Sequence, residues 1–192
     1  LKADGTIKFH GNLVPDASVL AALVETLAGG GMRRGKLVYD VTLAESVAAG
    51  SDVFAYTVPS GAGAEGALYE FELWWKNNTT SGNDARMWVN DDTTQSRYMS
   101  AMNAGGTDYT SYPIVGYSGS SAYKPGYTRG TISVMAGVVT IVGSGRRALS
   151  NQVVMSFAHI YDYNAPVTLT KIAVRGPYAV DSGARMKIRR LA

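Results

Sequence analysis

Leu68-Tyr69-Glu70-Phe71-Glu72-Leu73-Trp74 is the stretch of the 192-residue chain that decides its fold class. Apolar and acidic residues alternate along it, so Tyr69, Phe71 and Leu73 share one face, while the two glutamates and Trp74 share the other. A period of two indicates a β-strand with one face on a core and the other toward water. We therefore expect an antiparallel sheet around this stretch.

Further strand-like runs lie on both sides of it, at residues 36–43, 52–58, 85–89, 131–135, 138–142, 153–161, 167–174 and 185–191. Ala136-Gly137 is expected to form a two-residue turn between two of these strands, and the polar residues 77–83 to join 68–74 to 85–89 as a hairpin. Roughly ten short strands with Gly, Pro, Ser and Asn between them predict an all-β fold, an antiparallel jelly-roll-like β-sandwich. Strands do not alternate with helices, so a parallel α/β sheet is not expected.

One segment near the N-terminus has helical spacing. Its apolar residues Leu20, Leu23, Val24 and Leu27 follow possible capping residues, and three glycines at 29–31 end it. We expect a short N-terminal helix that either docks on its own domain or associates with copies of itself at a subunit axis. This predicts two parts: residues 1–31 as an attachment and oligomerisation segment with a glycine joint, and 32–192 as the β-sandwich domain.

Composition excludes much common chemistry. The chain has no cysteine and two histidines, which excludes disulfides, thiolate metal sites and cysteine nucleophiles, so no cofactor and no metal are expected. His159 lies in the middle of a strand and is predicted to be structural. No run reaches the roughly 18 apolar residues of a membrane span, so membrane insertion is not expected. The sequence therefore points away from an enzyme.

Charge is divided unevenly along the chain. Residues 1–100 hold 8 basic and 12 acidic residues, whereas residues 101–192 hold 10 and 3. A basic second half suits nucleic acid or anionic glycans, and it equally suits basic side chains on the exposed faces of strands. No nucleic-acid motif accompanies it, so no nucleic-acid partner is expected.

Two motifs have the residue types of a cofactor-binding or a catalytic site. The run Gly143-Ser144-Gly145-Arg146-Arg147-Ala148 fits a dinucleotide pattern, but no helix follows it, so we interpret it as a glycine-rich hairpin loop. Glu70 and Glu72 share a strand face about 7 Å apart, the spacing of an inverting glycosidase pair. Acidic residues on the solvent face of an antiparallel strand are the simpler expectation.

Tyrosines gather in one region. Six of the twelve lie between residues 98 and 127, interleaved with Gly, Ser, Asn and Thr. Such a mixture is typical of binding surfaces, because Tyr gives contact area at low entropic cost and its neighbours supply adaptable hydrogen bonds. Packing at the ends of the sandwich or between subunits is the alternative. The candidate ligand-binding residues are Tyr109, Tyr112, Tyr117, Tyr123 and Tyr127.

The C-terminal sequence carries a resemblance. Residues 166–176 (PVTLTKIAVRG), a glycine-containing turn, and residues 182–191 (SGARMKIRRL) resemble the end of many bacteriophage tail-fibre and virion-surface proteins. The opening residues 3–9 (ADGTIKF) also resemble the strand-forming entry of fibre modules. The resemblance implies a virion location, a homotrimer with a jelly-roll-like head, contacts with other virion proteins through the N-terminal segment, and recognition of a host-surface glycan or protein.

Three functions follow as expectations. The first is a non-enzymatic tail-fibre or receptor-binding module of a phage virion. The second is a capsid or tail decoration protein that contacts only virion proteins. The third is a polysaccharide-cleaving depolymerase that uses Glu70 and Glu72.

Overall fold

The computed structural model describes residues 7–9, 12–14, 35–76, 82–104, 107–109, 112–118, 126–147, 153–161 and 166–191. The chain divides into two compact units, Leu1–Arg34 and Gly35–Ala192. In the first unit, β1 (Ile7–Phe9) pairs antiparallel with β2 (Asn12–Val14). The helix predicted from residue 15 and the glycines at 29–31 lie outside the described residues, so the role of residues 1–31 stays a prediction.

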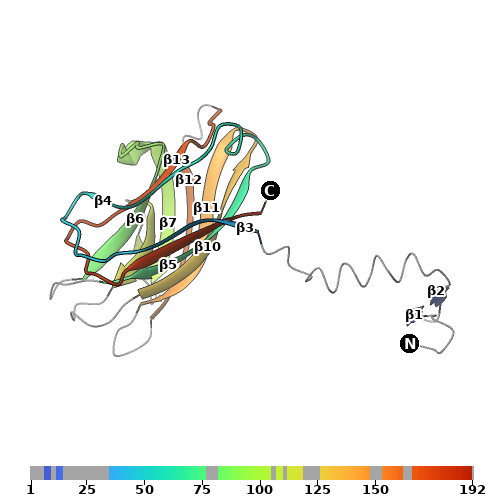
Figure 1. Ribbon diagram of the computed structural model, residues 1–192, viewed down its shortest axis with the longest axis horizontal. Coiled ribbons are helices and arrows are strands. Elements are labelled where there is room, and N and C mark those ends of the chain that lie inside the picture. Colours follow the sequence, from blue (N-terminus) through green and yellow to red (C-terminus); the bar gives the residue numbers. More distant parts are fainter. Residues whose placement is uncertain are drawn as a thin grey trace. The chain divides into compact units, whose positions relative to one another are not determined.

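The described part of the second unit consists of two antiparallel sheets and one short 3₁₀ helix, η1 (Gln95–Arg97) (Figure 1). The larger sheet has eight strands in the spatial order β3 (Lys36–Thr42), β14 (Arg185–Arg190), β5 (Leu68–Trp75), β10 (Gly126–Met135), β11 (Val138–Arg147), β12 (Val153–Tyr161), β7 (Tyr98–Ala104) and β8 (Thr107–Tyr109). The smaller sheet has four, in the order β4 (Asp52–Thr57), β13 (Lys171–Arg175), β6 (Asn83–Val89) and β9 (Ile114–Ser118). The prediction of an all-β, sandwich-like fold is confirmed.

The core follows from the alternation in β5. Tyr69, Phe71, Leu73 and Trp75 are all fully buried, while the residues between them are partly exposed. Their side chains join those of the smaller sheet in one apolar cluster. Burial of this kind is the main stabilising term of a two-sheet fold, at about 25 cal/mol per Å² of apolar surface.

Two glycines lie side by side at the centre of the larger sheet. Gly130 of β10 is in register with Gly143 of β11, with Phe71 and Phe157 as their outer neighbours in the same row. The two phenyl rings approach over the glycines, with centroids 6.3 Å apart. A Cβ atom on Gly143 would lie 2.5 Å from Phe157 Cζ, and one on Gly130 would lie 2.8 Å from Phe71 Cε1. The two rings thus occupy the space that side chains at these positions would need.

The predicted turn at Ala136-Gly137 is confirmed. It joins β10 to β11, which run side by side through the larger sheet (Figure 1). Both residues have positive φ, 53° and 71°, as two-residue hairpin turns require. The carboxylate of Glu65 accepts hydrogen bonds from both backbone N–H groups, at 2.6 and 3.0 Å. These bonds lower the pKa of Glu65 and hold the turn in a conformation that alanine disfavours.

The predicted hairpin between 68–74 and 85–89 is wrong. Both strands exist, but β5 lies in the larger sheet between β14 and β10, whereas β6 lies in the smaller sheet between β13 and β9. The chain therefore crosses from one sheet to the other between them. Both strands bury apolar residues. In two sheets that share a core, each strand buries its apolar side chains between the sheets, more completely than the two strands of one hairpin would.

Two further expectations differ from the structure. Residues 143–147 are not a loop, because β11 continues to Arg147 in register with β10 and β12. The strand expected at 167–174 begins only at Lys171 and ends at Arg175. Glycine was interpreted as a turn signal, whereas here Gly143 and Gly145 are strand residues whose missing side chains make room for neighbours.

His159 is a core residue. It is fully buried on β12, and its Nε2 lies 2.9 Å from the backbone carbonyl oxygen of Ile114, so this nitrogen carries the proton of the neutral ring. Its Nδ1 and the hydroxyl of Ser100, directly opposite on β7, have no hydrogen-bond partner among the described residues. Burial lowers the pKa of His159 to about 4. The prediction of a structural histidine agrees with this position.

Gly143→Ala is expected to destabilise the protein by about 2 kcal/mol, because the new methyl group meets the Phe157 ring and the backbone of β10. Urea denaturation measures the loss. Ser144→Ala is the matched control, since this side chain is exposed on the outer face. Equal midpoints for the two variants would show that the glycine row is not tightly packed.

Acid is expected to destabilise the protein through His159. In the unfolded chain His159 has its ordinary pKa of 6.5, whereas in the folded protein burial lowers this pKa to about 4. Between these two pH values the unfolded chain binds a proton that the folded protein does not, so the free energy of unfolding falls as pH falls from 6.5 to about 4. The loss is on the order of 3 kcal/mol. In His159→Gln, this part of the pH dependence of urea denaturation should disappear, whereas His10→Gln should keep it. The same pH profile in both variants would contradict the assignment.

Candidate functional site

The structure places the side chains of three of the five candidate tyrosines. Tyr112, Tyr117 and Tyr127 have described side chains, Tyr109 is described only as a backbone residue of β8, and Tyr123 lies outside the described residues. Tyr112 and Tyr117 pack against the core, and Tyr127 lies on the larger sheet.

Tyr117 belongs to β9 of the smaller sheet, and Tyr112 lies just before that strand. The Arg86 guanidinium carbon lies 3.8 Å from the centre of the Tyr112 ring, and Arg86 Nη2 lies 3.4 Å from the Asp84 carboxylate. Tyr117 is in register with Asp84 across β6 and β9, and it is half-buried against the core. These contacts are those of packed side chains, with a cation–π contribution at Tyr112.

Tyr127 lies on the outer face of the larger sheet. Directly opposite on β5 is Trp74, and the two ring centroids are 5.1 Å apart with an interplanar angle of 49°. Both rings are only partly buried. Arg185 Cζ and Lys187 Nζ, from β14, lie 5.8 and 5.5 Å from the Trp74 ring centre. The result is an aromatic pair, Trp74–Tyr127, at the surface with cations around it.

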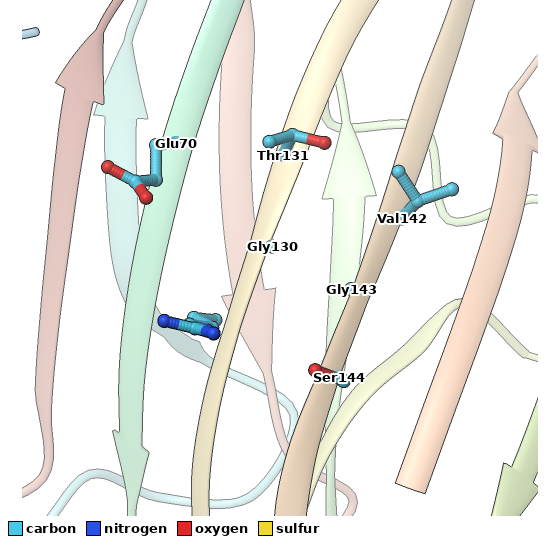
Figure 2. A pocket seen from close by; sticks show the side chains of 7 residues that line it. Glu70, Gly130, Thr131, Val142, Gly143 and Ser144 are labelled. Atoms are coloured by element: carbon cyan, nitrogen blue, oxygen red, sulfur yellow. The ribbon is translucent and has the colours of Figure 1, made fainter. Parts of the chain in front are cut away.

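A pocket lies beside this aromatic pair on the same sheet. Figure 2 shows that its walls come from Glu70 on β5, Thr131 on β10, and Val142 and Ser144 on β11, with Gly130 and Gly143 between them. Arg129 also lines it, and its volume is about 260 Å³. Because Gly130 and Gly143 carry no side chains, their backbone forms part of the pocket's lining.

Ion pairs organise the side of this face that lies toward β3. Arg185 donates two hydrogen bonds to Asp40, at 2.8 and 2.7 Å, and this contact lowers the pKa of Asp40. Arg189 Nη1 donates to the Glu72 carboxylate at 3.1 Å. A bidentate pair fixes the guanidinium plane, so Arg185 is held in place beside Trp74.

The Tyr127 hydroxyl stays protonated over the whole neutral range. Burial raises its pKa, and the negative charges of Glu72 and Glu70 raise it further, against the opposing charge of Arg129. A protonated phenol both donates and accepts hydrogen bonds. Tyr127 therefore offers a ring face and a polar group at one position.

The two glutamates considered for hydrolysis have different surroundings. Glu70 lines the pocket, whereas Glu72 accepts the hydrogen bond from Arg189. The two carboxylates therefore have different partners and do not line the pocket together. The only described histidine, His159, is buried on the opposite, inner face of the sheet. In the described ranges, no three His, Asp or Glu residues gather as a metal site, and no helix is long and apolar enough to cross a membrane.

Sequence reasoning named Tyr127 but missed the residues around it. The sequence did indicate that Trp74 faces outward, because the alternation at 68–74 places this large aromatic side chain on the face with the two glutamates. The signal for Arg129 and Arg146 was hidden, since the strands that carry them contain glycine and were predicted too short.

No protein-family model matches the chain, and no curated protein and no solved structure matches it. Its function is therefore argued from the residues and their arrangement.

Proposed function

We propose that the chain is a non-enzymatic structural protein of a bacteriophage virion, of the tail-fibre or receptor-binding class, that binds a host-surface glycan. The support for the virion class is the sequence resemblance of residues 166–176 and 182–191. The proposal includes a jelly-roll-like arrangement of the strands, a homotrimer, and attachment to other virion proteins through residues 1–31.

The observation that carries the binding function is the Trp74–Tyr127 pair on the outer face of the larger sheet. Its centroids lie 5.1 Å apart, and a pocket with polar and apolar lining begins two residues further along β10, at Arg129. Sugar rings present apolar C–H faces that stack on aromatic rings, while their hydroxyls need donors and acceptors. Glu70 and Ser144 supply these groups in the pocket.

Binding is favoured over hydrolysis at this place. Hydrolysis by inversion needs one carboxylic acid and one free carboxylate on either side of the bond. Only Glu70 lines the pocket, whereas Glu72 does not line it and accepts a hydrogen bond from Arg189, so the two carboxylates do not flank one bound group there.

Replacing either residue of the aromatic pair should weaken glycan binding. Trp74→Ala and Tyr127→Ala are each expected to weaken binding roughly thirtyfold, the effect of removing an aromatic side chain worth about 2 kcal/mol at the centre of an interface. An array of bacterial surface polysaccharides, followed by titration calorimetry with the glycan that binds, measures the change.

The control is Tyr178→Ala, because Tyr178 is 46% exposed and belongs neither to the pair nor to the lining of the pocket. Unchanged urea midpoints show that the variants fold. Full binding by both aromatic variants would exclude this site, and silence of the wild-type protein on the array would favour a decoration protein. Release of reducing ends that is lost in Glu70→Gln would instead show a depolymerase.

The proposed class also predicts the assembly state. Light scattering on the full chain should give three times the 20.4 kDa of one subunit. Fibre and receptor-binding heads of the class it resembles are homotrimers. A monomer at micromolar concentration would contradict the tail-fibre proposal.

A further inference from the structure

We propose that the glycan bound at the Trp74–Tyr127 pair is an acidic one, whose carboxylates are bound by Arg129, Arg146 and Lys187. This inference rests on the proposed function and names the class of ligand. It is carried by the position of three cations around one aromatic pair, and by the ion pairs that neutralise the other cations of this face.

The strand register places the three cations around the rings. Arg146 is directly opposite Tyr127 on β11, where facing Cβ atoms are about 5 Å apart. Arg129 follows Tyr127 on the same face of β10, about 7 Å along the strand. Lys187 Nζ lies 5.5 Å from the Trp74 ring centre. An acidic sugar stacked on the rings would therefore have a cation within reach on three sides.

The other cations of this face are already neutralised. Arg185 binds Asp40 through two hydrogen bonds, and Arg189 binds Glu72. Both guanidinium groups are thus fixed by acids of neighbouring strands. They shape the surroundings of Trp74 and leave little charge for a ligand.

Arg129, Arg146 and Lys187 form no salt bridge with any carboxylate in the described part of the chain, whose ion pairs involve other cations. Arg129 and Arg146 are exposed. One acidic side chain of the pocket, Glu70, also has no ion pair in these residues. Three cations against one anion leave a net positive charge at the aromatic pair, which complements a carboxylate-bearing ligand.

A single-stranded nucleic acid would also use cations and aromatic rings. Such sites have a basic groove along which several bases stack on successive aromatic side chains. Here the described residues offer one aromatic pair and no row of successive aromatic side chains, and the carboxylates of Glu70 and Glu72 near it can accept hydrogen bonds from sugar hydroxyls. An acidic glycan, with sparse charges and many hydroxyls, fits this arrangement better.

The test is binding to a panel of immobilised polysaccharides. The acidic members are polygalacturonate, alginate, hyaluronate and polysialic acid, and the neutral members are dextran, mannan and fully methyl-esterified polygalacturonate. An oligothymidylate is added as the nucleic acid. We expect at least one acidic glycan to bind about tenfold or more tightly than any neutral one, as a charge-assisted hydrogen bond allows, with an affinity that falls as sodium chloride is raised.

Single charge-removing variants locate the effect. Arg129→Gln and Arg146→Gln should each reduce the affinity for the acidic glycan about tenfold, and Arg146→Gln, whose side chain does not line the pocket, should leave binding to any neutral glycan unchanged. Lys36→Gln is the matched control, because Lys36 is exposed near the other end of the sheet, opposite Arg190, and its loss removes the same charge. Equal urea midpoints confirm that all three variants fold.

The outcomes separate the two proposals. Binding to neutral glycans that equals or exceeds binding to acidic ones overturns the acidic ligand and leaves the glycan-binding function in place. Tighter binding of the oligothymidylate than of every glycan overturns the acidic glycan in favour of nucleic acid. Silence with the whole panel overturns both proposals, and an equal loss in Lys36→Gln shows that net charge, not this site, attracts the glycan.

Discussion

The approach of Phe71 and Phe157 over Gly130 and Gly143 is the constraint on which the rest of the structure depends. The four residues form one row across β5, β10, β11 and β12, so they fix the register of the central strands. A one-residue slip would turn every side chain of a strand to the opposite face. The glycine row therefore decides which residues enter the core and which face outward.

The outer face of the larger sheet follows from that register. β14 and β5 present charged side chains together with Trp74, whereas β12 presents uncharged ones, among them Val154, which is 66% exposed, and Ala158. Tyr127 lies between these two halves. A ligand there meets aromatic surface and charge together, and the backbone of the glycine row lines the adjacent pocket.

Local patterns in the sequence predicted the strands, but they did not predict which strands pair with one another. Alternation at 68–74 and the pair Ala136-Gly137 are local signals, and both predictions are confirmed. The partner of β5 depends on packing between distant residues, so the expected hairpin was wrong. The loop predicted at the glycines of β11 was wrong for the same reason. Gly143 lies in a strand because it makes room for Phe157, which belongs to another strand. The site was predictable only in part for this reason, since Tyr127 was named, whereas Trp74, Arg146 and Lys187 come from other strands.

The uneven distribution of charge along the sequence brings an acidic strand next to basic strands in the larger sheet. β5, from the acidic first half, lies between β14 and β10, from the basic second half. Glu72 thus has Lys187 on one side and Arg129 on the other, and it binds Arg189. One strand with two glutamates cannot neutralise all the cations of its two neighbours. The surplus remains beside the aromatic pair because the acids of β5 end at Glu72, one row before the aromatic residues begin.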